Sequence, residues 1–138
     1  MLVVLDTSVL VAAWRSRSGA SFALLEELRD ESFRIALSVP LVIEYESVLL
    51  RHTAPPRRRA DVAALINYLC LIGVRQQVFF LWRPLLRDPN DDMVAEVAVA
   101  SQSKAIVTHN IKDFDAMSKF GVQVLTPGEF LVGHLRRS

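Results

Sequence analysis

Acidic residues follow several apolar segments of this sequence, at positions where their carboxylates could act together on a cation. Asp6 closes the first apolar run, and Glu44 lies one helical turn beyond the second. Asp91 and Asp92 follow the third run, and Asp113 follows the fourth. Carboxylates that lie close together repel one another, and a cation offsets that repulsion. Because no cysteine–histidine pattern accompanies these acids, the ligand chemistry favours Mg²⁺ or Mn²⁺ over zinc.

Ions held in this way activate water and stabilise the leaving oxygen of a phosphodiester, so the pattern predicts metal-assisted phosphodiester hydrolysis. Each acid also has a structural alternative. Asp6 could cap a helix, and Asp91 or Asp92 could cap a helix or stabilise its dipole. Glu44 would be a surface residue if Glu46 faced inward. None of these alternatives explains why all the acids follow strands.

The elements that must position these acids alternate between strands and helices. Apolar runs predict strands at 2–6, 33–38, 76–81, 104–110 and 122–126, and helical spacing lies at 9–14, 22–28, 40–49, 61–72, 93–101, 112–120 and from 127 onward. This alternation predicts a three-layer α/β/α sandwich around a central, mainly parallel sheet of about five strands. Functional sites of such sheets lie at the carboxyl ends of the strands, so the acids should meet at one edge.

Composition predicts one intracellular domain spanning residues 1–138. The 16 basic and 15 acidic residues nearly cancel, so charge alone indicates no partner. A single cysteine, Cys70, excludes an internal disulfide framework and fits the reducing cytoplasm. Its apolar neighbours predict that it is buried. No apolar run reaches 18 residues and no signal peptide is recognisable, which predicts a protein without a membrane anchor. Because 51% of the residues are hydrophobic, we expect part of the surface to form an oligomeric or partner interface.

Several segments resemble the PIN domain ribonucleases, and in particular the VapC-like toxins of toxin–antitoxin pairs. The matching segments are VVLDTSVL (3–10), VPLVIEYESVL (39–49), RDPNDDMVAEVAVAS (87–101), AIVTHNIKDF (105–114) and GVQVLTPGEFL (121–131). The resemblance covers almost the whole chain. It implies a metal-dependent endoribonuclease with RNA as substrate. It also implies a homodimer and a small antitoxin partner that inserts into the acidic groove.

The resemblance also implies the ligand set for one or two Mg²⁺ or Mn²⁺ ions. Asp6 and Glu44 correspond to the first two acids. Asp91 corresponds to the third, with Asp92 as a rival because the register of "NDD" can slip by one. The fourth ligand falls at Asn110 or Asp113. Many relatives have Asp where this chain has Asn110, and an amide ligates a cation more weakly than a carboxylate does.

Other residues are expected to support the ligands or the substrate. Thr7 or Ser8 would orient a ligand carboxylate or a phosphate. His109 is expected to have a hydrogen-bonded structural role rather than an acid–base role. Five arginines are candidate contacts to the RNA backbone, three in the segment RHTAPPRRR and two in the loop before the third acid: Arg57, Arg58, Arg59, Arg83 and Arg87.

Four other functions are weighed against the ribonuclease. A catalytically weakened PIN-fold protein that binds RNA or regulates a partner remains open because of Asn110. A DNA-directed nuclease also remains open, since metal–carboxylate chemistry does not itself read the 2′-hydroxyl. An aspartyl phosphatase with Asp6 as nucleophile is rejected, because Ser8 stands where that class needs a second Asp. A Ser8–His109 hydrolase is disfavoured, because Ser8 lacks the glycine-flanked elbow.

Overall fold

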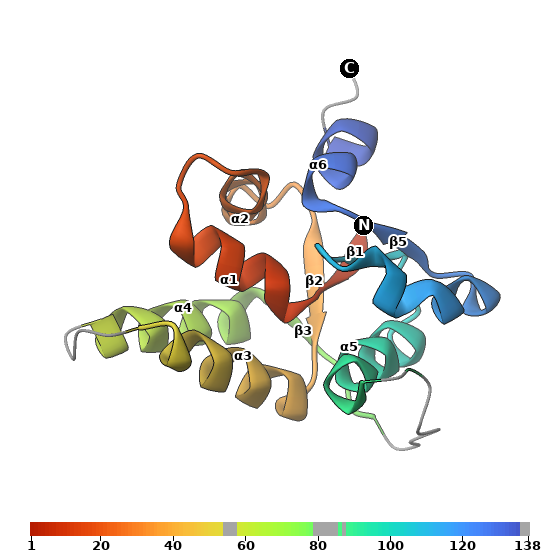
Figure 1. Ribbon diagram of the computed structural model, residues 1–138, viewed down its shortest axis with the longest axis horizontal. Coiled ribbons are helices and arrows are strands. Elements are labelled where there is room, and N and C mark those ends of the chain that lie inside the picture. Colours follow the sequence, from red (N-terminus) through yellow and green to blue (C-terminus); the bar gives the residue numbers. More distant parts are fainter. Residues whose placement is uncertain (54–57, 79–85, 87, 136–138) are drawn as a thin grey trace.

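A parallel sheet forms the centre of the protein. The computed structural model describes residues 1–53, 58–78, 86 and 88–135 (Figure 1). Within these residues the sheet has the strand order β3-β2-β1-β4-β5, and each pair is parallel. The strands are β1 (Leu2–Leu5), β2 (Arg34–Leu37), β3 (Val74–Arg75), β4 (Ala105–Val107) and β5 (Gln123–Leu125).

Strand β1 is the centre of the sheet, as its unbroken apolar sequence predicts. Val3, Val4 and Leu5 are buried, which fits a strand covered on both faces. Val3 pairs with Ile35 on β2 and with Ala105 on β4. The chain passes from β1 to β2 on one side and reaches β4 on the other. The carboxyl ends of β1 and β4 therefore mark the point where strand order reverses, which is where open α/β sheets bind ligands.

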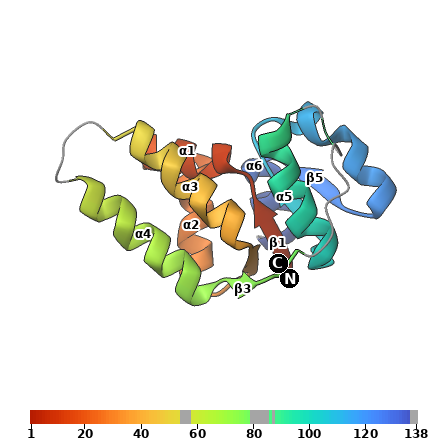
Figure 2. The same ribbon diagram turned by 90° about the horizontal axis from the view of Figure 1, so that it is seen from below.

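Helices cover both faces of the sheet, so the expected α/β/α sandwich is confirmed. Figures 1 and 2 place α1, α3 and α4 on one side of the sheet, and α5 with η1 on the other. The helices are α1 (Thr7–Arg15), α2 (Ala20–Arg29), α3 (Val39–Arg51), α4 (Arg58–Ile72), α5 (Pro89–Ala100), the 3-10 helix η1 (Ile111–Phe120), α6 (Pro127–Phe130) and the π-helical turn η2 (Leu131–Leu135). None of the described helices is long and apolar enough to cross a membrane.

The third strand lies earlier than the sequence indicated. It occupies Val74–Arg75, whereas the expected strand at 76–81 begins after it, and residues 79–81 lie outside the described part. Gly73 explains this placement. A Cβ atom there would lie 2.8 Å from the Leu69 carbonyl oxygen and closer still to the Leu37 side chain. The end of α4 can therefore approach β2 closely, and pairing starts at once.

The prediction that Cys70 is buried is wrong, because its side chain is exposed. Helix α4 packs through one stripe that includes Val62, Ile66 and Leu69. These residues follow the spacing of a single helix face. Cys70 comes directly after Leu69, about 100° further around the helix, and therefore faces away from the core. Apolar neighbours in sequence did not indicate its orientation.

Candidate active site

Asp6 lies at the carboxyl end of β1, where two hydroxyl groups hold its carboxylate. Its side chain is 6% exposed. Ser8 Oγ donates to Asp6 Oδ2 at 2.7 Å, and Thr108 Oγ1 donates to the same oxygen at 2.8 Å. Within the part of the chain that the structure describes, Asp6 Oδ1 receives no hydrogen bond. One carboxylate oxygen is therefore fixed by the protein, while the other remains available to a ligand.

The same two hydroxyls join the ends of β1 and β4. Ser8 Oγ accepts from the His109 backbone N–H at 3.1 Å, and Thr108 Oγ1 accepts from the Asn110 N–H at 2.9 Å. Each hydroxyl has one proton, which goes to Asp6, and its lone pairs accept the amides. This network fixes the position of Asp6 relative to the loop that follows β4.

Thr108 is a supporting residue that the sequence analysis missed. It is completely buried, and it follows β4 just as Asp6 follows β1. A hydroxyl residue directly after an apolar strand, in the segment AIVTHNIKDF, was the available signal. Because it contacts Asp6 from a neighbouring strand, only the sheet order gives it this role.

Replacing Thr108 by Val should destabilise the protein by about 2 kcal/mol, since it removes a donor to a charged carboxylate and a partner of a backbone amide. The melting temperature should fall by several degrees. Thr53→Val is the matched control, because Thr53 donates only to the neutral Leu49 carbonyl at 2.8 Å. Thermal unfolding of the two variants checks the prediction. An equal fall in melting temperature in both variants would show that the contact between Thr108 and Asp6 adds nothing to stability.

Tyr45 is a second supporting residue beside Asp6. It is 1% exposed, and its hydroxyl donates to the Leu5 carbonyl oxygen at the last residue of β1. Burial, and secondarily the charge of Asp6, raise the pKa of Tyr45 well above its ordinary value. Tyr45 therefore stays a neutral donor and holds the strand end that carries Asp6.

Asp91 is the acid whose environment is most perturbed. Burial and nearby carboxylates together raise the pKa of Asp91 from its ordinary 3.8 to about 7. Burial is the largest cause, followed in decreasing order by the charges of Asp6, Asp88, Asp113 and Asp92. The side chain lies in the first turn of α5 and is half-buried. Asp6 after β1, Asp91 on α5 and Asp113 on η1 thus lie within electrostatic reach of one another, as the order of elements predicted for these three acids.

Asp91 and Asp92 point in different directions. Asp92 is 1% exposed, and its Oδ1 accepts the Leu86 backbone N–H at 2.8 Å. Helix α5 begins at Pro89, four residues before the expected start. Both acids are therefore inside the first turn, and the Asp88 carbonyl accepts the backbone N–H groups of Asp91 at 3.0 Å and Asp92 at 3.3 Å. Asp92 supports the preceding segment, and Asp91 is the acid whose pKa the neighbouring carboxylates raise.

The remaining candidate ligands are less closely grouped. Glu44 is half-buried in α3, but it is not among the carboxylates that raise the pKa of Asp91. Asp113 is exposed in the first turn of η1. Asn110 precedes η1, and its exposed side chain makes no capping hydrogen bond. Among the described residues, no three His, Cys, Asp or Glu side chains form a ready-made metal-binding group.

The residues nevertheless fit a divalent cation in donor chemistry. Several carboxylates share one edge, and Asp6 Oδ1 receives no hydrogen bond from the described residues. Burial, and after it the charge of the neighbouring carboxylates, raises the pKa of Asp91, and a cation would offset that charge. Hard oxygen donors of this kind suit Mg²⁺ and Mn²⁺. The acids at this edge are therefore of the donor type that such cations prefer.

His109 makes the kind of hydrogen bond that was expected of a structural residue. Its Nε2 lies 2.7 Å from Ser21 Oγ on α2, and its backbone N–H donates to Ser8. Thr7 is the first residue of α1, is half-buried and lies beside Ser8. Both residues therefore border the edge where the acids meet.

The arginines expected to bind RNA are only partly described. Arg57, Arg83 and Arg87 lie outside the described residues, as does the side chain of Arg58. Arg59 is exposed near the start of α4. Figures 1 and 2 place that end of α4 on the far side of the molecule from α5 and η1.

The fold is an α/β/α sandwich with acids at the switch point of a parallel sheet, and the comparison with known proteins agrees with this class of fold. The sequence model of the PIN domain matches residues 2–112. The structure is similar to a chain in the 2.2 Å structure of VapBC-1 from nontypeable Haemophilus influenzae, with a TM-score of 0.65. The two chains are 16% identical, and the match covers 93% of this chain and 99% of that one. No curated protein matches the sequence.

The chain therefore belongs to the PIN domain family, whose members are generally nucleases that use divalent metals. The match to the family spans four of the five strands, β1 through β4, together with the helix segment that carries Asp91. The resemblance identified from the sequence is confirmed at the level of family and fold.

Proposed function

We propose that this protein is a Mg²⁺- or Mn²⁺-dependent endoribonuclease and the toxin of a toxin–antitoxin pair. The observation that supports the proposal best is Asp91, whose pKa is raised to about 7 by burial and by the charges of Asp6, Asp88, Asp113 and Asp92. Acids that perturb one another in this way at a switch point are typical of functional sites. Membership of the PIN domain family supports the same chemistry.

Asp6, Asp91 and Asp113 would hold the cation, with Glu44 approaching from α3 and Asn110 as a weaker alternative to Asp113. One or two bound ions would supply charge stabilisation and lower the pKa of water. The chain's own residues prepare this site. Ser8 and Thr108 fix Oδ2 of Asp6, so that Oδ1 keeps a constant orientation.

Partners follow from the same proposal. The fold resembles a chain of VapBC-1, which supports a small antitoxin as partner in the cytoplasm. A homodimer would cover the large apolar side chains that are exposed on neighbouring helices: Val39 and Ile43 on α3, and Leu71 on α4. The arginines Arg57, Arg58, Arg59, Arg83 and Arg87 remain candidate contacts to the RNA backbone.

Incubation of the inhibitor-free protein with a mixed pool of structured RNA should give cleavage in Mg²⁺ or Mn²⁺ and none with a chelator. A DNA pool of matched sequence should stay intact, which tests the choice of RNA over DNA. RNA that remains uncut under both metals would contradict the nuclease. It would favour the alternative of a catalytically weakened PIN-fold protein, with Asn110 as the first residue to examine.

A further inference from the structure

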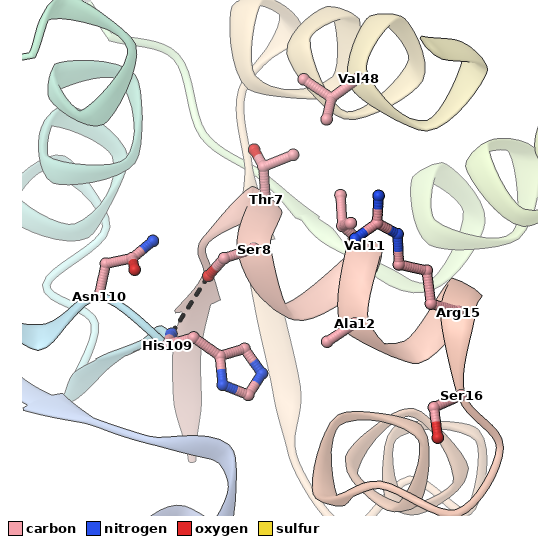
Figure 3. A pocket seen from close by; sticks show the side chains of 9 residues that line it. All are labelled: Thr7, Ser8, Val11, Ala12, Arg15, Ser16, Val48, His109 and Asn110. Carbon is pink, nitrogen blue, oxygen red and sulfur yellow. Dashed lines mark hydrogen bonds between the residues drawn. The ribbon is translucent and has the colours of Figure 1, made fainter. Parts of the chain in front are cut away.

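A pocket lies next to the acidic edge and shares Ser8 and Asn110 with it. It is a depression open to solvent, with a volume of about 570 Å³, between α1, α3 and the loop after β4 (Figure 3). This volume lies within the range of small-molecule sites, about 300 to 1,000 Å³. Ser8 lines the pocket and also bonds Asp6, so the pocket and the acidic edge adjoin one another.

The pocket combines an apolar wall with free polar groups. Val11 and Ala12 on α1 and Val48 on α3 supply the apolar surface. The Asn110 side chain makes no hydrogen bond to the described residues, so both its donor and its acceptor groups are available. The Thr7 hydroxyl also lines the pocket and has no hydrogen-bond partner in the described ranges. An apolar surface with amide and hydroxyl groups at its edge suits a nucleobase and its sugar.

Charge distinguishes the pocket from the acids next to it. None of the described residues that line it is acidic, and Arg15 lies at its far end. The Arg15 guanidinium lies 2.8 Å from His52 Nδ1 and has no acidic partner in the part of the chain that the structure describes. Arg15 follows Ser8 by seven residues, about 10 Å along the helix axis. A polyanion crossing the acidic edge would therefore meet a cation beyond it.

We infer that this pocket binds one ribonucleotide of the RNA substrate, next to the scissile phosphate. The nucleobase lies against Val11, Ala12 and Val48, Asn110 and Thr7 read its polar edge, and Arg15 binds the following phosphate. The inference rests on the proposed ribonuclease activity and makes the pocket the place where base preference arises. A peptide is the less favoured occupant, because the free amide, hydroxyl and guanidinium groups match a nucleotide.

Nuclear magnetic resonance titration of the metal-free protein with the four ribonucleoside 5′-monophosphates tests the pocket without catalysis. The resonances of Thr7, Ala12 and Val48 should change their chemical shifts and reach saturation as nucleotide is added. One of the four nucleotides should bind more tightly than the others. Ala12→Leu should place a larger side chain where the base would lie and weaken that binding about tenfold. Ala64→Leu, at an exposed helical alanine outside the pocket, is the matched control.

Arg15→Gln should also weaken binding, whereas Arg34→Gln should not, because Arg34 is exposed at the amino end of β2. In the RNA assay, Ala12→Leu should change which sites are cut. If the nucleotides bind as expected but RNA is never cut, the nuclease proposal fails and the pocket stands. If Ala12→Leu keeps wild-type binding and cleavage sites in an active enzyme, the pocket inference is overturned, and a partner peptide becomes the occupant to test.

Discussion

Replacing Asp6 by Asn should reduce RNA cleavage at least 100-fold while the protein remains folded. The amide oxygen can still accept the protons of Ser8 and Thr108, so the network around Oδ2 survives. The change places a neutral amide group where Asp6 Oδ1 would bind the cation. Losing an outer support of a metal ligand already lowers affinity or activity about 10- to 100-fold, and loss of a ligand itself should exceed that.

Asp61→Asn is the matched control for this prediction, because Asp61 is exposed in the first turn of α4. Its activity should equal that of the wild type. Calorimetric titration with Mn²⁺ gives a second measurement that does not depend on cleavage, and Asp6→Asn should bind the ion more weakly. If Asp6→Asn cleaves RNA and binds Mn²⁺ as well as Asp61→Asn does, the assignment of Asp6 as a ligand is wrong.

The metal-free protein should lose stability as the pH rises from about 4 to about 7, and Asp91 should be responsible. Its pKa is raised from 3.8 to about 7, so between these values the folded state binds a proton that the unfolded state has released. Stability falls with pH wherever the folded state binds more protons. Because Asp91 is half-exposed, solvent screening reduces its effect to about 1 to 2 kcal/mol.

Asp91→Asn should remove this part of the pH dependence and raise the melting temperature at pH 8 by several degrees. Melting curves of the metal-free protein between pH 4 and 8 provide the measurement. Asp30→Asn, at the exposed C-terminus of α2, serves as the control and should follow the wild type. Parallel curves for wild type and Asp91→Asn would show that the Asp91 carboxylate is not strained in the folded protein.

Added Mn²⁺ should reverse the loss of stability at high pH in the wild type, since a cation competes with the proton for the same carboxylate. At a hundred times its dissociation constant, a ligand specific to the folded state adds about 2.7 kcal/mol. The stabilisation should therefore be larger at pH 8 than at pH 5. Asp91→Asn should lose most of it, and Glu44→Gln should show whether α3 contributes a ligand.

Strand ends were predictable from the sequence because apolar runs define them locally. The run before Asp6 is unbroken, so the acid had to lie at the carboxyl end of a buried strand. The alternation of strands and helices then required parallel pairing, and parallel strands bring their carboxyl ends to one edge. For this reason the sequence alone predicts that Asp6, Glu44, Asp91 and Asp113 lie near one another. In the structure Asp6 and Asp113 act on Asp91, whereas Glu44 is not among the carboxylates that raise its pKa.

Orientation within a helix was not predictable to the same extent. Adjacent residues differ by about 100° around a helix, so a shift of one residue in the start exchanges the direction of Asp91 with that of Asp92. The tertiary structure starts α5 at Pro89 and brings Asp91 within electrostatic reach of Asp6. The error at Cys70 has the same origin.

By itself the sequence determined the order of elements, the acidic residues at strand ends and the family. Only the tertiary structure decided which side chains meet across strands. Thr108 reaches Asp6 because β4 pairs with β1, and Tyr45 reaches Leu5 because α3 packs against α1, the helix that follows β1. The same packing forms the pocket between α1, α3 and the β4 loop. Contacts between residues far apart in the chain depend on the packing of whole elements, which local patterns do not specify.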